Sequence, residues 1–173
     1  MSRIAGCMTA IKTLIFTILV PGTVGVWVPI SILGGSGARG SLPIDGLRYV
    51  GLSAMLVGAS IYLWCAWDFT FAGNGTPAPI DPPKKLVVGG LYRYVRNPMY
   101  VGVLSLVLGE AAWYESRQLF AYAALVFVSF FAIVVFYEEP ALKRKFGDSY
   151  VRYRAVVPRW IPRPRARPTK PRV

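Results

Sequence analysis

Three long stretches of this chain carry no charged side chain, and they constrain its fold more than any other feature. They run from Thr13 to Ala38, from Tyr49 to Ala66 and from Leu119 to Tyr137. The hydrocarbon core of a bilayer is about 30 Å thick, and a helix of about 20 apolar residues crosses it. A soluble protein of 173 residues could not surround three such helices with other protein. We therefore expect an all-α integral membrane protein.

The apolar segments predict four transmembrane helices, over residues 11–33, 47–71, 99–113 and 119–137. Pro21 and Pro29 predict a kink in the first, which is longer than the apolar part of a usual signal peptide and is read as a retained helix. The third is only about 24 Å long, so a re-entrant segment remains an alternative to a full crossing. Small residues at helical spacing on this third segment predict close packing against another helix; they are Gly102, Ser105 and Gly109.

Basic residues concentrate on one side of this arrangement. With four crossings and a cytoplasmic N-terminus, seventeen of the twenty Lys and Arg residues fall on the cytoplasmic side. This asymmetry follows the positive-inside rule, so both termini are expected in the cytoplasm. Eleven of the basic residues follow Tyr137, and we interpret them as a segment facing anionic lipid, with no role in nucleic acid binding.

The chain after Tyr137 is expected to form two short amphipathic helices on the cytoplasmic face. Apolar and aromatic side chains recur there at helical spacing, and Gly147 separates the two helices. Residues 163–173 are rich in Pro and Arg and are expected to be disordered. Residues 1–162 are interpreted as one membrane domain.

Two polar clusters, residues 90–102 and 137–140, are expected to meet at the cytoplasmic ends of adjacent antiparallel helices. Ionisable groups at membrane depth are costly and are usually functional. A structural alternative is that Glu138 and Glu139 only neutralise Arg93 and Arg96 as ion pairs. The sequence has no histidine and only two cysteines, so no metal site is predicted.

The two clusters also carry a family resemblance. The segment from Gly90 to Gly102 resembles the Arg-x-Pro-x-Tyr-x-Gly signature of the isoprenylcysteine carboxyl methyltransferase and phospholipid methyltransferase superfamily. Residues 137–162 are similar to its C-terminal block, which has Glu-Glu-Pro, a basic helix, Phe-Gly and Pro-Arg-Trp-Ile-Pro. The resemblance extends from Phe71 to Pro162.

This resemblance implies an S-adenosylmethionine-dependent membrane methyltransferase with a lipid-like or amphiphilic methyl acceptor. The candidate catalytic residues that it implies are Arg96, Asn97 and Glu139. The oligomeric state stays open. The implied cofactor-binding residues are Tyr92, Arg96, Pro98, Tyr100, Gly102, Tyr137, Glu138 and Glu139.

Two positions depart from the family pattern. Asn97 stands where the family often has histidine, and asparagine cannot act as a base near neutral pH. Gly58 stands alone where phosphatidylethanolamine methyltransferases carry Gly-x-Gly, so carboxylate, amine and thiol acceptors all stay open. The alternatives are an NADPH-dependent membrane reductase of the sterol-reductase type and a non-enzymatic membrane protein.

Overall fold

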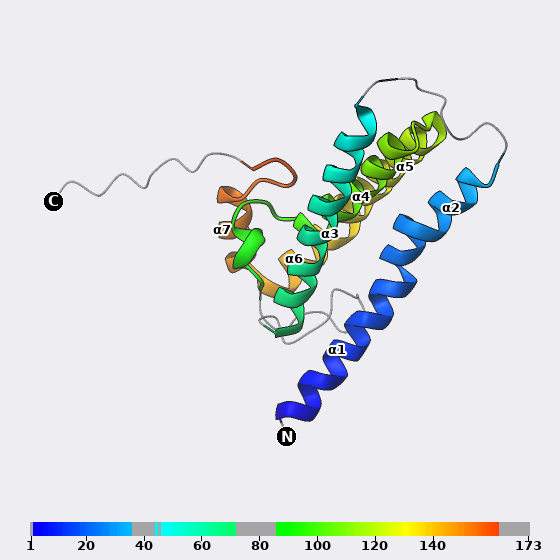
Figure 1. Cartoon of the computed structure of the whole chain (residues 1–173). Coiled ribbons are helices and arrows are strands. Elements are labelled where there is room, and N and C mark those ends of the chain that lie inside the picture. The colour runs from blue at the N-terminus through cyan, green and yellow to red at the C-terminus, as the bar shows by residue number, and fades with distance from the viewer. Residues whose placement is uncertain (1, 36–43, 45, 72–85, 163–173) are drawn as a thin grey trace.

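The described part of this computed structural model comprises residues 2–35, 44, 46–71 and 86–162, and all of its regular structure is helical. The prediction for residues 163–173 lies outside it. Figure 1 shows long helices side by side, with shorter ones gathered at one end. In chain order the elements are α1 (Ser2–Leu19), η1 (Thr23–Trp27), α2 (Val28–Leu33), α3 (Leu47–Phe71), η2 (Gly90–Arg93), α4 (Pro98–Trp113), α5 (Arg117–Ala132), η3 (Ile133–Glu138), α6 (Glu139–Phe146) and α7 (Asp148–Val156).

Three helical segments are long and apolar enough to cross a membrane, which makes this an integral membrane protein. They are Ile11–Leu33, Leu47–Thr70 and Arg117–Phe146, and Pro98–Trp113 is a shorter apolar helix. The prediction of an all-α membrane fold is confirmed. The short helix α4 runs antiparallel to α3, because Gly102 lies against Gly58 while Gly109 lies against Gly51.

Four glycines allow α3 and α4 to approach closely. A Cβ atom added to Gly58 would lie 2.6 Å from the carbonyl oxygen of Gly102, and one added to Gly51 would lie 2.6 Å from that of Gly109. Such distances leave no space for a side chain. The close packing predicted from Gly102 and Gly109 is therefore confirmed, and α3 is the partner helix.

The first transmembrane helix changes its helical type after its first proline, and the kink predicted for it stays a prediction. The α-helical turns of α1 end at Leu19, and the chain continues through the π-helical segment η1 into α2. Pro21 has no backbone N–H to donate to the preceding turn. For brevity, α1, η1 and α2 together are called helix 1, which lies along one side of the bundle (Figure 1).

The last long helix extends further than expected. The sequence predicts an end at Tyr137, but helical turns continue from Arg117 to Phe146 through α5, η3 and α6. Pro140 does not end the helix, because it lies in the first turn of α6 directly after the wide π-helical turns of η3. Gly147, with a φ of 52°, then turns the chain into α7.

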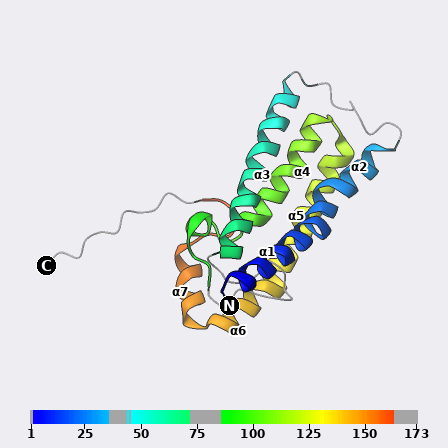
Figure 2. The same ribbon diagram turned by 60° about the horizontal axis from the view of Figure 1, so that its bottom comes forward.

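After α7 the chain returns to the base of α4. The backbone N–H of Arg96 donates to the carbonyl oxygen of Pro158 at 2.8 Å, and that of Asn97 donates to Arg159 at 3.3 Å. Tyr150 anchors α7 and is almost fully buried. In Figure 2, α6 and α7 lie at one end of the bundle, near the segment that leads into α4. The two polar clusters meet as the sequence predicts, because Arg96 pairs with Glu139 and Tyr100 donates to Glu138.

Candidate functional site

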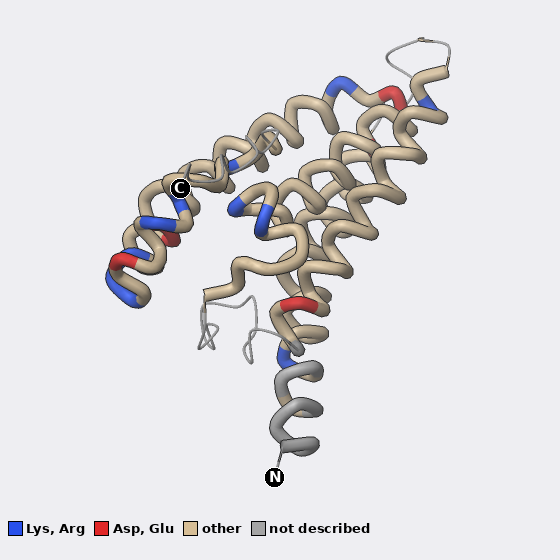
Figure 3. The backbone as a smooth tube through the Cα atoms, turned by 90° about the vertical axis from the view of Figure 1, so that its left-hand side faces the viewer, with Lys and Arg blue, Asp and Glu red and all other residues tan. Residues whose placement is uncertain are grey.

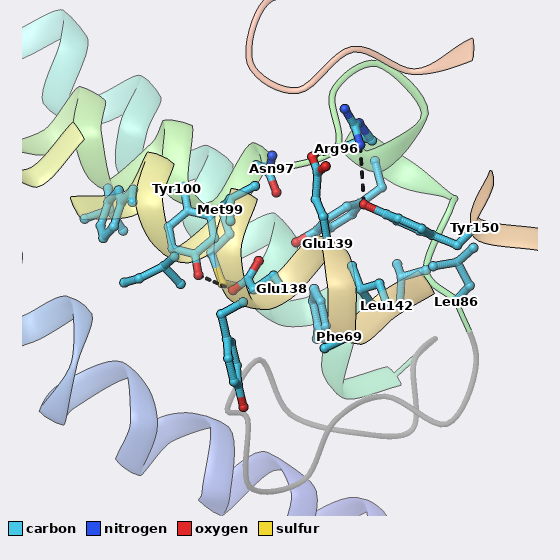
Figure 4. A pocket seen from close by; sticks show the side chains of 18 of the residues that line it. Phe69, Leu86, Arg96, Asn97, Met99, Tyr100, Glu138, Glu139, Leu142 and Tyr150 are labelled. Atoms are coloured by element: carbon cyan, nitrogen blue, oxygen red, sulfur yellow. Dashed lines mark hydrogen bonds and ion pairs between the residues drawn. The ribbon is translucent and has the colours of Figure 1, made fainter. Parts of the chain in front are cut away.

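A cavity of about 530 Å³ opens where the short helices meet the long ones. Its volume lies within the range typical of small-molecule sites. One part is polar and is lined by side chains of the segment before α4, of η3 and of α6 and α7 (Figure 4). Another part is apolar and lies between helix 1 and η3. Its residues include Phe16, Val20, Pro21, Val24, Ile133 and Val134.

Arg96 lies at the polar part of the cavity. Its Nη1 is 3.0 Å from the Glu139 Oε1 and 3.3 Å from the Tyr150 hydroxyl, to which it donates. Figure 4 shows these three side chains together. The Nε of Arg96 is buried and has no hydrogen-bond partner among the described residues. A buried donor of this kind is costly unless a ligand or water accepts from it.

Glu139 is engaged by two arginines. Besides the contact with Arg96, it accepts from the Arg159 Nε at 2.6 Å and from the Arg159 Nη2 at 3.0 Å, one bond to each carboxylate oxygen. This fork geometry is the strong form of an arginine–carboxylate pair, and it raises the pKa of Arg159. Glu139 is only 7 % exposed. The ion pair between Arg96 and Glu139 that was the structural alternative is therefore present, whereas Arg93 is exposed.

Glu138 has different surroundings from its neighbour. It lines the cavity and accepts a short hydrogen bond from the Tyr100 hydroxyl, as Figure 4 shows. None of the ion pairs found among the described residues involves Glu138. The Tyr100 ring packs against Phe130 at 4.6 Å and against Trp160 at 6.5 Å between centroids. A cavity-facing carboxylate is thus held in place by a packed tyrosine.

Asn97 joins the site to the C-terminal segment. Its Nδ2 donates to the carbonyl oxygen of Arg159 at 3.3 Å, and its backbone N–H donates to the same oxygen. Asn97 also lines the cavity. Its amide therefore helps to hold Arg159, and through it the Arg159–Glu139 pair, at the cavity.

The other candidate residues divide into two groups. Tyr92 and Tyr137 line the cavity. Tyr92 is buried against the edge of Phe69, which raises the pKa of its phenol. Pro98 and Gly102 are not among the lining residues. Pro98 is buried at the start of α4, and Gly102 faces α3.

Sequence reasoning did not single out several parts of the site. Two of them are Arg159, which donates hydrogen bonds to Glu139, and Trp160, which packs against Tyr100. Both lie in the Pro-Arg-Trp-Ile-Pro block of the family resemblance. Tyr153 donates to the Tyr92 carbonyl oxygen at 2.6 Å. The contribution of helix 1 had no sequence signal, because its cavity residues are ordinary apolar ones.

These features define a small helical membrane protein with a cavity that is charged in one part and apolar in another. The sequence model of the phospholipid methyltransferase family matches residues 47–149, and the chain belongs to this family. The predicted resemblance is confirmed.

Three curated relatives match part of the chain, and two of them are methyltransferases by name. The chain is 42 % identical over 80 residues to protein-S-isoprenylcysteine O-methyltransferase of Schizosaccharomyces pombe, which covers 44 % of this chain and 33 % of that protein. It is 38 % identical over 79 residues to protein-S-isoprenylcysteine O-methyltransferase B of Arabidopsis thaliana, covering 45 % and 40 %. The cobalt-zinc-cadmium resistance protein CzcN of Cupriavidus metallidurans is 32 % identical over 117 residues, covering 68 % and 48 %. The matched region is thus less than half the length of each relative.

Proposed function

We propose that this protein transfers a methyl group from S-adenosylmethionine to a lipid-like or amphiphilic acceptor at the cytoplasmic face of the membrane. The observation that carries the proposal is the cavity, whose lining includes Arg96 and Glu138 as well as the apolar wall formed by helix 1 and η3. A charged cofactor fits the first part and a hydrocarbon chain fits the second. Family membership supports the same reaction.

The polar residues present fit S-adenosylmethionine. Its methionyl part carries a carboxylate and an ammonium group, and its ribose carries hydroxyl groups. The unpartnered Nε of Arg96 is a donor for the carboxylate. Glu138, which has no arginine partner among the described ion pairs, is an acceptor for the ammonium group or the hydroxyls.

Bound S-adenosylmethionine would supply a methyl group that is already activated by the sulfonium. The protein then has to align the two reactants, and such alignment alone lowers the activation barrier substantially. Arg96 and Glu138 would fix the cofactor, and Tyr100 would hold Glu138 in place through its hydroxyl. Glu139 would act through Arg96 by holding its guanidinium at the cavity.

Methyl transfer into lipid tests this proposal. Membranes containing the protein are incubated with S-adenosylmethionine labelled in its methyl group, and label in the organic extract is counted. We expect label above that of membranes lacking the protein, and a large loss in Glu138→Gln. The matched control is Asp148→Asn, which makes the same change at an exposed carboxylate outside the cavity and should retain transfer.

Absence of label in the organic extract, together with oxidation of added NADPH by the same membranes, would replace methyl transfer by the reductase alternative. Equal losses in Glu138→Gln and Asp148→Asn would remove Glu138 from the site.

A further inference from the structure

Helix 1 forms a wall of the cavity although it lies outside the family match. The match begins at residue 47, whereas Phe16, Val20 and Val24 of helix 1 line the cavity. These three residues are spaced four apart, so they share one helix face. The polar part of the site comes from the matched region and the segment that follows it, while this wall comes from outside the matched region.

Hydrogen bonds fix helix 1 on both sides of Val20. The Thr17 hydroxyl is 2.8 Å from the Tyr62 hydroxyl of α3. Beyond Val20, the Tyr122 hydroxyl of α5 donates to the Val24 carbonyl oxygen at 2.9 Å. Interhelical hydrogen bonds of this kind hold helices together in a bilayer. The cavity face of helix 1 therefore has a defined position relative to α3 and α5.

The space between helix 1 and η3 suits a hydrocarbon chain. Its lining includes apolar side chains from both segments, Val20 and Val24 of helix 1 and Ile133 and Val134 of η3. Both walls belong to segments long and apolar enough to cross a membrane, where lipid chains are the neighbouring solvent. Val20 is 47 % exposed, so its side chain is accessible to a ligand at this part of the cavity.

We propose that helix 1 selects the methyl acceptor, with Phe16, Val20 and Val24 contacting its hydrocarbon chain and limiting its length and bulk. That the bound molecule is a methyl acceptor rests on the proposed function. Binding of a hydrocarbon chain by helix 1 does not depend on the cofactor.

The test uses a 16-carbon alkylamine that bears a diazirine in its chain. The purified protein in detergent is irradiated with this probe, and labelling that excess unlabelled hexadecylamine removes is mapped by mass spectrometry. We expect this competed labelling on residues 16–24 and 133–137. Val20→Phe, which fills the cavity, should lower it about tenfold, the scale on which a hydrophobic pocket discriminates by one or two carbons.

Two variants serve as controls. Val26→Phe makes the same substitution at a residue of similar exposure, 49 %, that does not line the cavity, and it should label as the wild type does. Val20→Ala enlarges the cavity, and its result does not depend on whether Val20→Phe folds correctly. It should retain labelling by the 16-carbon probe and gain labelling by a 20-carbon one.

Calorimetry with S-adenosylmethionine on the same proteins separates the two proposals. If the wild-type protein is labelled on helix 1 but binds no cofactor, chain binding by helix 1 stands and the methyltransferase proposal is overturned. Competed labelling confined to other helices, or lowered equally by Val20→Phe and Val26→Phe, would overturn the role of helix 1 whatever the cofactor does.

Discussion

Glu138 and Glu139 are neighbours in the sequence, but their surroundings give them separate roles. Glu139 is bound by Arg96 and Arg159, so its charge is neutralised inside the protein. Glu138 faces the cavity and is held by Tyr100. The sequence could pair Glu139 with Arg96 as one alternative, but it could not decide which glutamate stays free for a ligand.

Glu139→Gln is expected to destabilise the fold. The change leaves the Arg96 guanidinium, whose side chain is 11 % exposed, without its carboxylate partner. Removing one member of a buried ion pair costs about 3 kcal/mol or more. Thermal unfolding in detergent should therefore start at a clearly lower temperature than in the wild type.

A double variant shows whether this loss comes from the ion pair. Once Glu139 is neutral, Arg159→Gln should cost little more, because the two side chains share one interaction. Additive losses in unfolding temperature would contradict a coupled pair between Glu139 and Arg159.

At the scale of helices, the contact between α3 and α4 sets the position of the site. Gly58 and Gly102 meet with no space for a Cβ atom, and α4 carries Tyr100 directly beside this contact. Where two helices pack this closely, a single added methyl group has to move one of them.

Gly58→Ala should lower the unfolding temperature, because its Cβ atom would lie 2.6 Å from the Gly102 carbonyl oxygen. Overpacking of this kind costs about 1–3 kcal/mol. Gly25→Ala is the matched control, since a Cβ atom there meets nothing within 4 Å. Equal stability of Gly58→Ala and the wild type would mean that α3 and α4 are not packed in this way.

The helices could be predicted from the sequence better than their contacts. The uncharged stretches and the glycine spacing of α4 carry physical information, because lipid excludes charge and close packing needs small residues. The π-helical turns of η1 and η3 have no comparable pattern, so the continuation past Tyr137 was missed. The pairing of Arg159 with Glu139 depends on how α7 returns to α4, which local sequence does not specify.

At the scale of the whole molecule, charge indicates how the protein sits in the membrane. Figure 3 shows basic residues gathered on α6 and α7 at one end of the bundle. At the opposite end, where α3 begins and α4 ends, Arg48 pairs with Glu115 at 3.0 Å. From this distribution and the positive-inside rule we propose that the polar part of the cavity faces the cytoplasm.

Reporter fusions test this orientation. A reporter fused after Val173 should be active only in the cytoplasm, and one inserted at Gly37 only on the outside, because the basic residues resist translocation. An active external reporter after Val173 would place the polar part of the cavity on the wrong side for a cytoplasmic cofactor.

Cofactor binding by the purified protein tests the central claim most directly. Titration calorimetry in detergent should show saturable binding of S-adenosylmethionine or of its demethylated product, and none of NADPH. Glu138→Gln should weaken that binding about ten- to a hundredfold, since a charge-assisted hydrogen bond contributes roughly 1.5–3 kcal/mol. Saturable binding of NADPH with no heat from S-adenosylmethionine would contradict the methyltransferase assignment of this site.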